Sequence, residues 1–140
     1  MPQPIPYLSF NGNCADAMRF YERVFEGDMK ALMSYGETPM ADEVPKEAHD
    51  RIMHAFLVLK GGGSLYAGDC PPNVEYDGKK QTMLAISYPT ETEAVAVFHA
   101  LADGGEITMP LAPTFWAKIF GMVTDKFGVS WAVNGAEISA

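Results

Sequence analysis

The chain has 140 residues, of which 48% are apolar and 20% charged, and its formal net charge is −8. This length and composition predict one globular domain with a core and exclude a disordered chain. The acidic balance argues against nucleic acid and anionic membranes as partners, because binding to them depends on Lys and Arg contacting phosphates.

The first half of the chain predicts a strand, a helix and three further strands. Apolar residues recur at helical spacing over 14–26, with Asn13 expected to cap the helix and Gly27 to end it. An acidic loop over 36–50 separates the second and third strands, and it is a lid, a partner surface or a solvated connection. The strands are expected over 5–11, 29–35, 52–59 and 64–67.

The second half repeats this order at a constant distance along the chain. Its helix is expected over 91–103, with Thr90 as the cap and Gly104 at the end, each 77 positions after its counterpart. Both halves therefore read βαβββ, and the segments 3–6 and 71–80 bound them. The strands of the second half are expected over 83–88, 107–111, 118–124 and 129–133.

A single βαβββ unit leaves one face of its sheet without a helix. Two such units can bury those open faces against each other, which creates a cleft lined by both sheets. We therefore predict an α+β fold in which two tandem βαβββ modules, at about 5–70 and 82–135, form paired curved mixed sheets around a cleft. Residues 1–140 would form a single domain, with the facing sheets supplied by one chain or by two swapped chains.

Several segments resemble the vicinal oxygen chelate superfamily, which includes glyoxalase I, bleomycin resistance proteins, fosfomycin-modifying enzymes and extradiol dioxygenases. The chain looks most like the PhnB-like group, which is sometimes labelled with a 3-demethylubiquinone methyltransferase-type domain name. The resemblance implies a glyoxalase-like fold and a homodimer. The segments that carry it are 6–12, 17–21, 53–55, 109–116, 120–128 and Trp131.

Members of this superfamily that use a metal hold a divalent ion with side chains from four equivalent places in the two modules. In this chain those places correspond to Pro6, Tyr66, Met83 and Ala132. None of them offers the imidazole or carboxylate that such an ion prefers. We therefore expect no metal and no other cofactor, with a divalent ion bound elsewhere as the alternative.

The residues expected to touch a ligand are those that could face the cleft. For each of them a structural role is the alternative: a backbone-bonded histidine for His54, a carboxylate that caps a turn for Asp69, and a packing residue for Trp116. Lys118 would supply a cation to the cleft or lie on a solvated face, and Cys70 has no Lys or Arg near it in the sequence to make it a nucleophile. The candidates are His54, Tyr66, Asp69, Met83, Phe115 and Trp116, and none is assigned a catalytic role.

The sequence favours a metal-independent protein that binds a neutral or cationic small molecule. The alternative is a metal-dependent lyase, isomerase or dioxygenase whose metal site has moved to His54 with Glu37 or Asp69. A third hypothesis is a partner-binding module that uses the 36–50 loop. Methyltransferase activity is not expected, because the chain lacks a glycine-rich nucleotide-binding turn.

Composition also predicts the compartment. No apolar run approaches the roughly 20 residues of a membrane helix, and residues 1–6 hold neither a basic patch nor an apolar stretch, so we expect no signal peptide. The two cysteines suit a reducing environment. We therefore expect a cytoplasmic protein.

Overall fold

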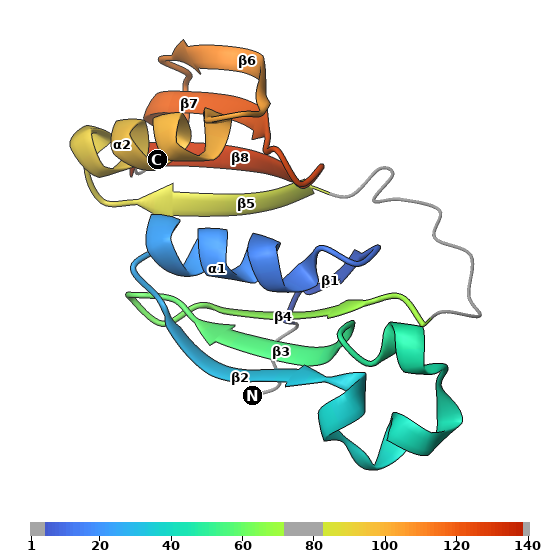
Figure 1. The fold of residues 1–140 in the computed structure, drawn as a ribbon. Helices are drawn as coiled ribbons and strands as arrows, with labels where there is room; N and C mark the ends of the chain where they lie inside the picture. Colours follow the sequence, from blue (N-terminus) through green and yellow to red (C-terminus); the bar gives the residue numbers. More distant parts are fainter. Residues whose placement is uncertain (1–4, 72–82, 139–140) are drawn as a thin grey trace. The chain divides into compact units, whose positions relative to one another are not determined.

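The computed structural model describes residues 5–71 and 83–138. The chain divides into two compact units, Met1–Gly78 and Lys79–Ala140, and each unit has its own sheet and helix (Figure 1). The expected connecting segment 71–80 lies outside the described residues except for Pro71, and the segment 3–6 does so except for Ile5 and Pro6.

Both units show the predicted order of a strand, a helix and three strands. The α+β fold with two tandem βαβββ modules is therefore confirmed. Unit 1 contains β1 (Tyr7–Phe10), α1 (Cys14–Val24), β2 (Asp28–Ser34), β3 (Ile52–Val58) and β4 (Ser64–Asp69). Unit 2 contains β5 (Met83–Tyr88), α2 (Glu91–Ala102), β6 (Glu106–Ala112), β7 (Ala117–Thr124) and β8 (Ser130–Glu137).

The two sheets have the same topology. The strand order is β1-β4-β3-β2 in unit 1 and β5-β8-β7-β6 in unit 2. The first strand of each unit is parallel to the last, and the remaining pairs are antiparallel. The helix of each unit carries the chain from the first strand, at one edge of the sheet, to the second strand at the opposite edge.

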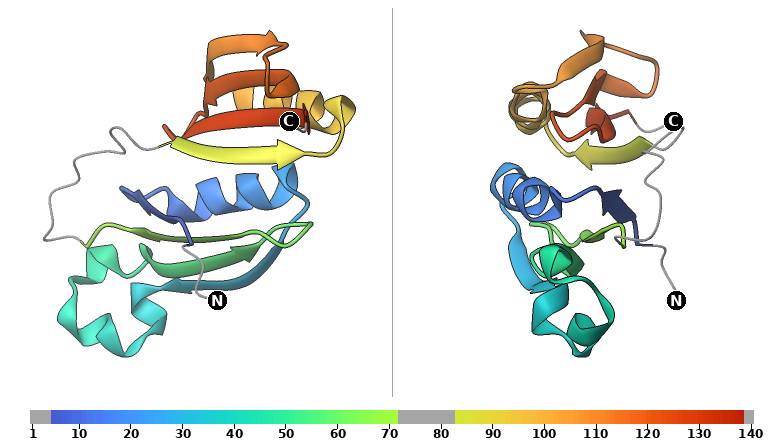
Figure 2. Two further views of the ribbon diagram at one scale, coloured as in Figure 1. Left: turned by 180° about the vertical axis from the view of Figure 1, so that it is seen from behind. Right: turned by 45° about the vertical axis from the view of Figure 1, so that its right-hand side comes forward.

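The helix of each unit covers one face of its own sheet (Figure 2). In unit 1, Met18 and Tyr21 of α1 are fully buried, as is Leu57 of β3. In unit 2 the helix approaches the sheet so closely that a Cβ at Gly121 would lie 2.7 Å from the Phe98 ring. Successive side chains of a strand point to opposite faces, so the neighbours of these residues lie on the face that the helix leaves open.

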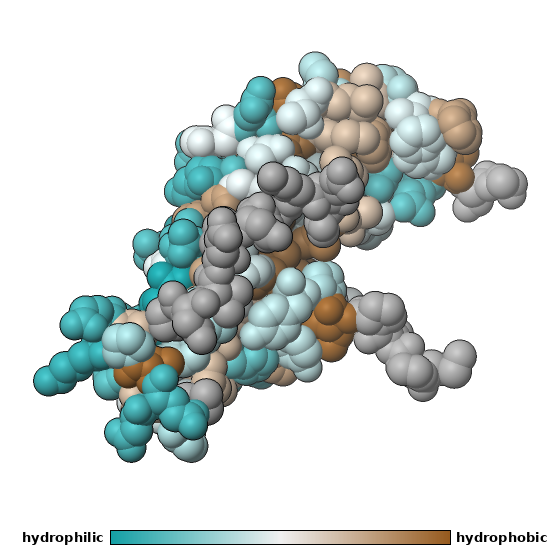
Figure 3. Space-filling model, turned by 90° about the vertical axis from the view of Figure 1, so that its right-hand side faces the viewer, coloured by the Kyte–Doolittle hydropathy of each residue, from teal (hydrophilic) through white to brown (hydrophobic). Residues whose placement is uncertain are grey.

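The acidic 36–50 loop is folded into three short 3₁₀ helices, η1 (Tyr35–Glu37), η2 (Pro39–Glu43) and η3 (Lys46–Ala48). The Ser34 hydroxyl donates to the Glu37 carboxylate at 2.7 Å, and this bond, together with one from the Ser34 backbone, holds the pKa of Glu37 below its ordinary value. The segment presents a largely hydrophilic surface (Figure 3, lower left). Its role as a lid or partner surface stays a prediction.

The start of α1 is capped differently from the prediction. Asn13 occupies the cap position, but its side chain makes no cap hydrogen bond. The Asp69 carboxylate at the end of β4 instead accepts from the N–H groups of Gly12 at 2.7 Å and Cys14 at 3.1 Å. Thr90 caps α2 as predicted, accepting from the Glu93 N–H at 3.2 Å. In unit 1 a charged acceptor from a distant strand has taken the place of the local amide.

The end of α1 also departs from the prediction. Glu26, not Gly27, takes the left-handed conformation, with φ of 50°. Gly27 is needed because a Cβ there would lie 2.8 Å from the Val58 carbonyl oxygen. In unit 2, Gly104 is left-handed as predicted, and Gly105 makes the close approach to β7. The helix starts are 77 positions apart but the ends 78, because α1 has 11 residues and α2 has 12.

No helix in the described part of the chain combines the length and the apolar character needed to cross a membrane.

Candidate functional site

Four aromatic side chains gather on the face of the unit 1 sheet that α1 leaves open. Tyr7 comes from β1, His54 and Phe56 from β3, and Tyr66 from β4, where Tyr66 lies beside Tyr7 on one strand and Phe56 on the other. The ring centroids of Phe56 and Tyr66 are 5.1 Å apart, and those of His54 and Tyr66 are 5.3 Å apart. Tyr7 completes the group at 6.2 Å from Tyr66 and 6.3 Å from His54. We call these four residues the aromatic face.

The four residues of the aromatic face include no Lys, Arg, Asp or Glu. Burial of the Tyr7 phenol raises its pKa, with smaller contributions from Cys14 and Tyr35, so the hydroxyl stays protonated at neutral pH. That hydroxyl donates a long hydrogen bond of 3.4 Å to the Met53 carbonyl. The π faces of tyrosine and phenylalanine rings carry a negative electrostatic potential, which attracts cations. The rings also stack with flat molecules. The arrangement can therefore hold a flat neutral or cationic group.

The sequence singled out two of these four residues, His54 and Tyr66. Phe56 could have been added, because it lies two positions after His54 in the same strand and so shares its face. Tyr7 could not be placed beside Tyr66 from the sequence, because that contact depends on the register between two strands separated by more than fifty residues.

Asp69, another candidate, does not join the aromatic face. It lies three positions after Tyr66 in β4, an odd spacing that puts the two side chains on opposite faces. Its carboxylate is buried, and it accepts from the Ile52 N–H at 2.8 Å as well as from the two N–H groups at the start of α1. These bonds hold Asp69 at the start of α1, and its contact with a ligand stays a prediction.

The unit 2 candidates divide between the open face of that sheet and the solvent. The Trp116 indole N–H donates to the Asn134 side-chain oxygen at 2.9 Å, and its ring lies edge-on to Phe120 at 5.1 Å. Phe120 and Asn134 are cross-strand neighbours on the face opposite α2, and Met83 lies on that same face. Phe115 is 90% exposed.

The four positions that correspond to metal-binding places of the resembled superfamily do not fit a divalent ion. Tyr66 belongs to the aromatic face and offers only a phenol, and Pro6, just before β1, offers no side-chain donor atom. Met83 and Ala132 lie on the open face of unit 2 and offer no oxygen or nitrogen side-chain donor. Within residues 5–71 and 83–138, no group of three His, Cys, Asp or Glu side chains is placed to hold an ion.

Two of the residues named for the relocated metal site, Asp69 and Glu37, are engaged in other hydrogen bonds. His54 lies on the aromatic face, whereas the Asp69 carboxylate lies on the face toward α1, bonded to backbone N–H groups. Glu37 accepts from the hydroxyl and the backbone of Ser34 in the 3₁₀ segment. Asp69 therefore lies on the opposite face of the sheet from His54, and the metal-dependent alternative stays a prediction.

The fold places the Arg51 side chain beside Cys70, a contact that the sequence around Cys70 did not suggest. The Arg51 guanidinium donates to the Cys70 carbonyl at 3.0 Å and to the Asn11 side-chain oxygen at 3.1 Å, and it lies 3.3 Å from the Cys70 sulfur. Cys70 is only 8% exposed. The contacts tie the end of β4 to the start of β3.

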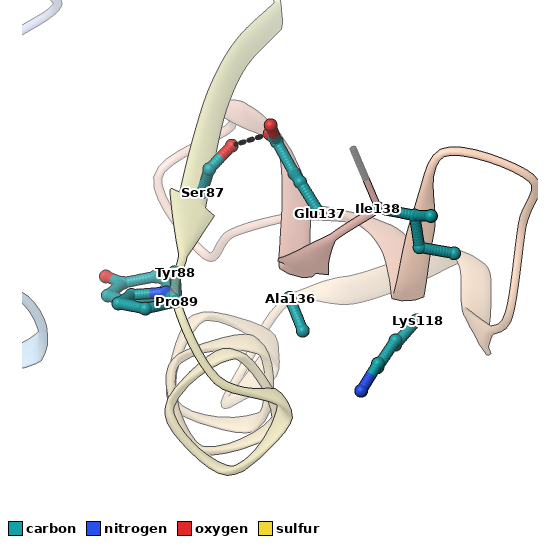
Figure 4. A pocket seen from close by; sticks show the side chains of 7 residues that line it. All are labelled: Ser87, Tyr88, Pro89, Lys118, Ala136, Glu137 and Ile138. Carbon is teal, nitrogen blue, oxygen red and sulfur yellow. Dashed lines mark hydrogen bonds between the residues drawn. The ribbon is translucent and has the colours of Figure 1, made fainter. Parts of the chain in front are cut away.

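Unit 2 contains a hollow of about 590 Å³ where β5 ends and α2 begins (Figure 4). The Ser87 hydroxyl donates to the Glu137 carboxylate at 2.7 Å on one side of it, and Lys118 lies on another. The sequence considered Lys118 but missed Glu137, because its last strand was predicted to end at Val133 whereas β8 continues to Glu137. Tyr88, Pro89, Ala136 and Ile138 complete the lining.

Comparison with known proteins gives consistent matches along nearly the whole chain. The model of the family described as 3-demethylubiquinone-9 3-methyltransferase matches residues 2–134. Protein YjdN of Escherichia coli K12 is 35% identical over 137 residues, which cover 92% of each chain.

Solved structures give the same picture. Protein PA1353 from Pseudomonas aeruginosa is 43% identical with a TM-score of 0.87, covering 96% of this chain and 97% of that one. The PhnB protein from Bacillus cereus, described as a putative 3-demethylubiquinone-9 3-methyltransferase, is 29% identical with a TM-score of 0.76 and coverage of 95% and 98%. A glyoxylase/bleomycin resistance protein/dioxygenase domain from Frankia sp. EAN1pec, 15% identical with a TM-score of 0.67 and coverage of 96% of each chain, shares the fold.

Proposed function

We propose that this chain, which belongs to the 3-demethylubiquinone-9 3-methyltransferase family, the PhnB-like group of the vicinal oxygen chelate superfamily, binds a small molecule. The proposed ligand is neutral or cationic, and its binding does not depend on a metal. The observation that carries this proposal is the aromatic face, where three rings contact Tyr66 within 6.2 Å. The physiological ligand would place a flat or cationic group against these rings.

Charge supports a neutral or cationic ligand over an anionic one. The net charge of −8 lowers the potential around the whole molecule and so favours the approach of cations. A cation over a tyrosine or phenylalanine ring gains about 0.5–2 kcal/mol, depending on how far it is desolvated. An anion would meet electron-rich ring faces and no Lys or Arg among the four residues of the aromatic face.

The donor set supports metal independence. Neither the four positions inferred from the resemblance nor the set of His54, Glu37 and Asp69 presents converging imidazole and carboxylate groups. The methyltransferase description of the family does not assign that reaction here. Each sheet is a four-stranded mixed sheet with one helix, and it lacks the parallel βαβ repeat that binds nucleotide cofactors.

A titration with three bicyclic probes tests the proposal: 1-methylquinolinium as the cation, quinoline as the neutral form and 2-naphthoate as the anion. Calorimetry should show the cation binding best and the anion worst. Tyr66→Ala should weaken cation binding by roughly 3- to 30-fold, in line with the loss of a cation–π contact. Phe115→Ala removes an aromatic ring that is 90% exposed and serves as the matched control.

Two results would contradict the proposal. One is binding that prefers the anion or that responds equally to the Tyr66 and Phe115 variants. The other is a stoichiometric divalent metal in protein purified without chelator that is lost in His54→Ala, which would restore the metal-dependent lyase, isomerase or dioxygenase.

We also propose that the protein acts as a homodimer in the cytoplasm. Apolar side chains on the edge strands are exposed, among them Met33 at 38% and Ile107 at 45%, and burying such surface favours association. Cys14 and Cys70 are not joined by a disulfide in the described part of the chain, which suits a reducing compartment. Sedimentation as a 15.3 kDa monomer at micromolar concentration would contradict the dimer, and recovery from a secreted fraction would contradict the location.

A further inference from the structure

The hollow in unit 2 combines an open cavity with two opposite charges that do not neutralise each other. Figure 4 shows the Glu137 carboxylate beside Ser87 on one side and the Lys118 ammonium on the other, with Ala136 between them. Within the part of the chain that the structure describes, Lys118 forms no ion pair or hydrogen bond, with Glu137 or with any other group. Its three donor positions therefore remain available to a ligand.

Glu137 is held in a defined place but keeps most of its acceptor capacity. The Ser87 hydroxyl occupies one acceptor position of its carboxylate at 2.7 Å. An ionised carboxylate has about four such positions, so several stay available. A carboxylate held this way binds an amine with less loss of side-chain freedom than a mobile one.

The backbone around Ala136 is held in a conformation that alanine rarely adopts. Ala136 has φ of 54°, in the left-handed region that disfavours residues with a Cβ atom. The Ile138 N–H donates to the Trp116 carbonyl at 2.8 Å, and together with the Ser87–Glu137 bond it fixes this turn at the end of β8. Backbone strain of this kind is often found at ligand sites, and here it lies in the lining of the hollow.

We propose that this hollow binds a small zwitterion, with a protonated amine against Glu137, a carboxylate against Lys118 and a short apolar linker along the walls. Pro89 and Ile138 supply apolar surface for such a linker. A ligand with only a negative charge would leave the Glu137 carboxylate without a positive partner. A ligand with only a positive charge would leave the Lys118 ammonium without a negative partner. The volume of about 590 Å³ accommodates a molecule of amino-acid size. The hollow is lined by residues of unit 2, whereas the aromatic face consists of residues of unit 1, so different variants test this proposal and the proposed function.

The probe for this site is 6-aminohexanoate, whose flexible chain lets the distance between its two charges adjust. Hexanoate and hexylamine each keep the same chain and one of the charges. Backbone amide shifts of Tyr88, Ala136, Glu137 and Ile138 in nitrogen-15 NMR spectra report binding at the hollow. The zwitterion should give saturable shifts and bind at least about three-fold more tightly than either single-charge analogue, as expected for one further exposed ion pair.

Two charge-removing variants and one control separate the parts of the proposal. Glu137→Gln should reduce the affinity for 6-aminohexanoate to that for hexanoate, and Lys118→Met should reduce it to that for hexylamine. Lys126→Met removes a charge at the β7–β8 turn, outside the hollow, and should change nothing. Unperturbed amide shifts elsewhere in each variant establish that it is folded.

The inference is overturned by any of three outcomes. The first is that no saturable shifts appear up to about 20 mM 6-aminohexanoate, a range in which even weak binding is detected. The second is equal affinity for 6-aminohexanoate, hexanoate and hexylamine. The third is binding of 6-aminohexanoate that neither Glu137→Gln nor Lys118→Met weakens. None of these outcomes bears on the binding of bicyclic probes at the aromatic face.

Discussion

Replacing Asp69 should destabilise unit 1 far more than replacing the residue at the helix cap itself. The Asp69 carboxylate accepts three buried or half-buried backbone N–H groups, from Gly12, Cys14 and Ile52, at 2.7, 3.1 and 2.8 Å. A hydrogen bond to a charged acceptor contributes about 1.5 kcal/mol at the lower end of its range, so Asp69→Ala removes about 4.5 kcal/mol. That is close to the whole stability of a marginal domain.

The conservative variant Asp69→Asn makes the prediction measurable in a folded protein. Its amide oxygen can replace Oδ1 and keep the bonds to Gly12 and Cys14, while the amide nitrogen cannot accept from Ile52. The expected loss is about 2 kcal/mol in the free energy of unfolding. Urea unfolding followed by far-UV circular dichroism measures it, with the m-value as a check on cooperativity.

Asn13→Ala is the matched control. The Asn13 side chain makes no cap bond, so its removal should cost less than about 0.5 kcal/mol, although an asparagine that caps a helix would cost about 1 kcal/mol. A loss at Asn13 as large as that of Asp69→Asn would refute the assignment of the cap to the distant carboxylate.

Three further predictions concern other points of the fold. Asp125→Ala should lower the free energy of unfolding by about 3–4 kcal/mol and shift the tryptophan emission, because its carboxylate accepts from two backbone N–H groups and from the Trp131 indole at 2.8 Å; an unchanged emission would refute the indole contact. Gly105→Ala should lower the free energy of unfolding, measured by thermal unfolding, by about 2 kcal/mol or more, because its Cβ would overlap the backbone at the end of β7. Gly63→Ala is the control, since its Cβ would meet only ordinary contacts at 3.4 Å and beyond. Equal losses in the two variants would contradict this reason. The pKa of Tyr7 is raised in the folded protein, so the phenol ionises first in the unfolded chain as the pH passes 10.0, and the free energy of unfolding falls above that pH. In urea unfolding at alkaline pH, Tyr7→Phe should therefore lose less stability than the wild type. Equal losses would contradict the raised pKa.

Much of the fold could be predicted because its signals are local. The expected strand over 83–88 coincides with β5, and the helices begin at Cys14 and Glu91 as predicted. Each of these features depends on side-chain periodicity or on a turn within a few residues. The repeat of βαβββ followed from them.

The candidate site could be predicted only in part. Strand alternation predicted that His54 and Phe56 share one face, and the same rule would have placed Asp69 on the face opposite Tyr66, because the two lie an odd number of positions apart. Glu137 was missed because the strand continues past the last clearly apolar stretch, through the left-handed turn at Ala136.

The sequence by itself determined the order of the elements, the duplication and the absence of imidazole and carboxylate at the four inferred metal positions. The tertiary structure decided which distant groups meet: the aromatic rings around Tyr66, the Asp69 carboxylate at the start of α1, and Arg51 beside Cys70. The physical reason is that strand register and long-range hydrogen bonds depend on the pairing of segments far apart in the chain, whereas helix and strand patterns depend on neighbours within one or two turns.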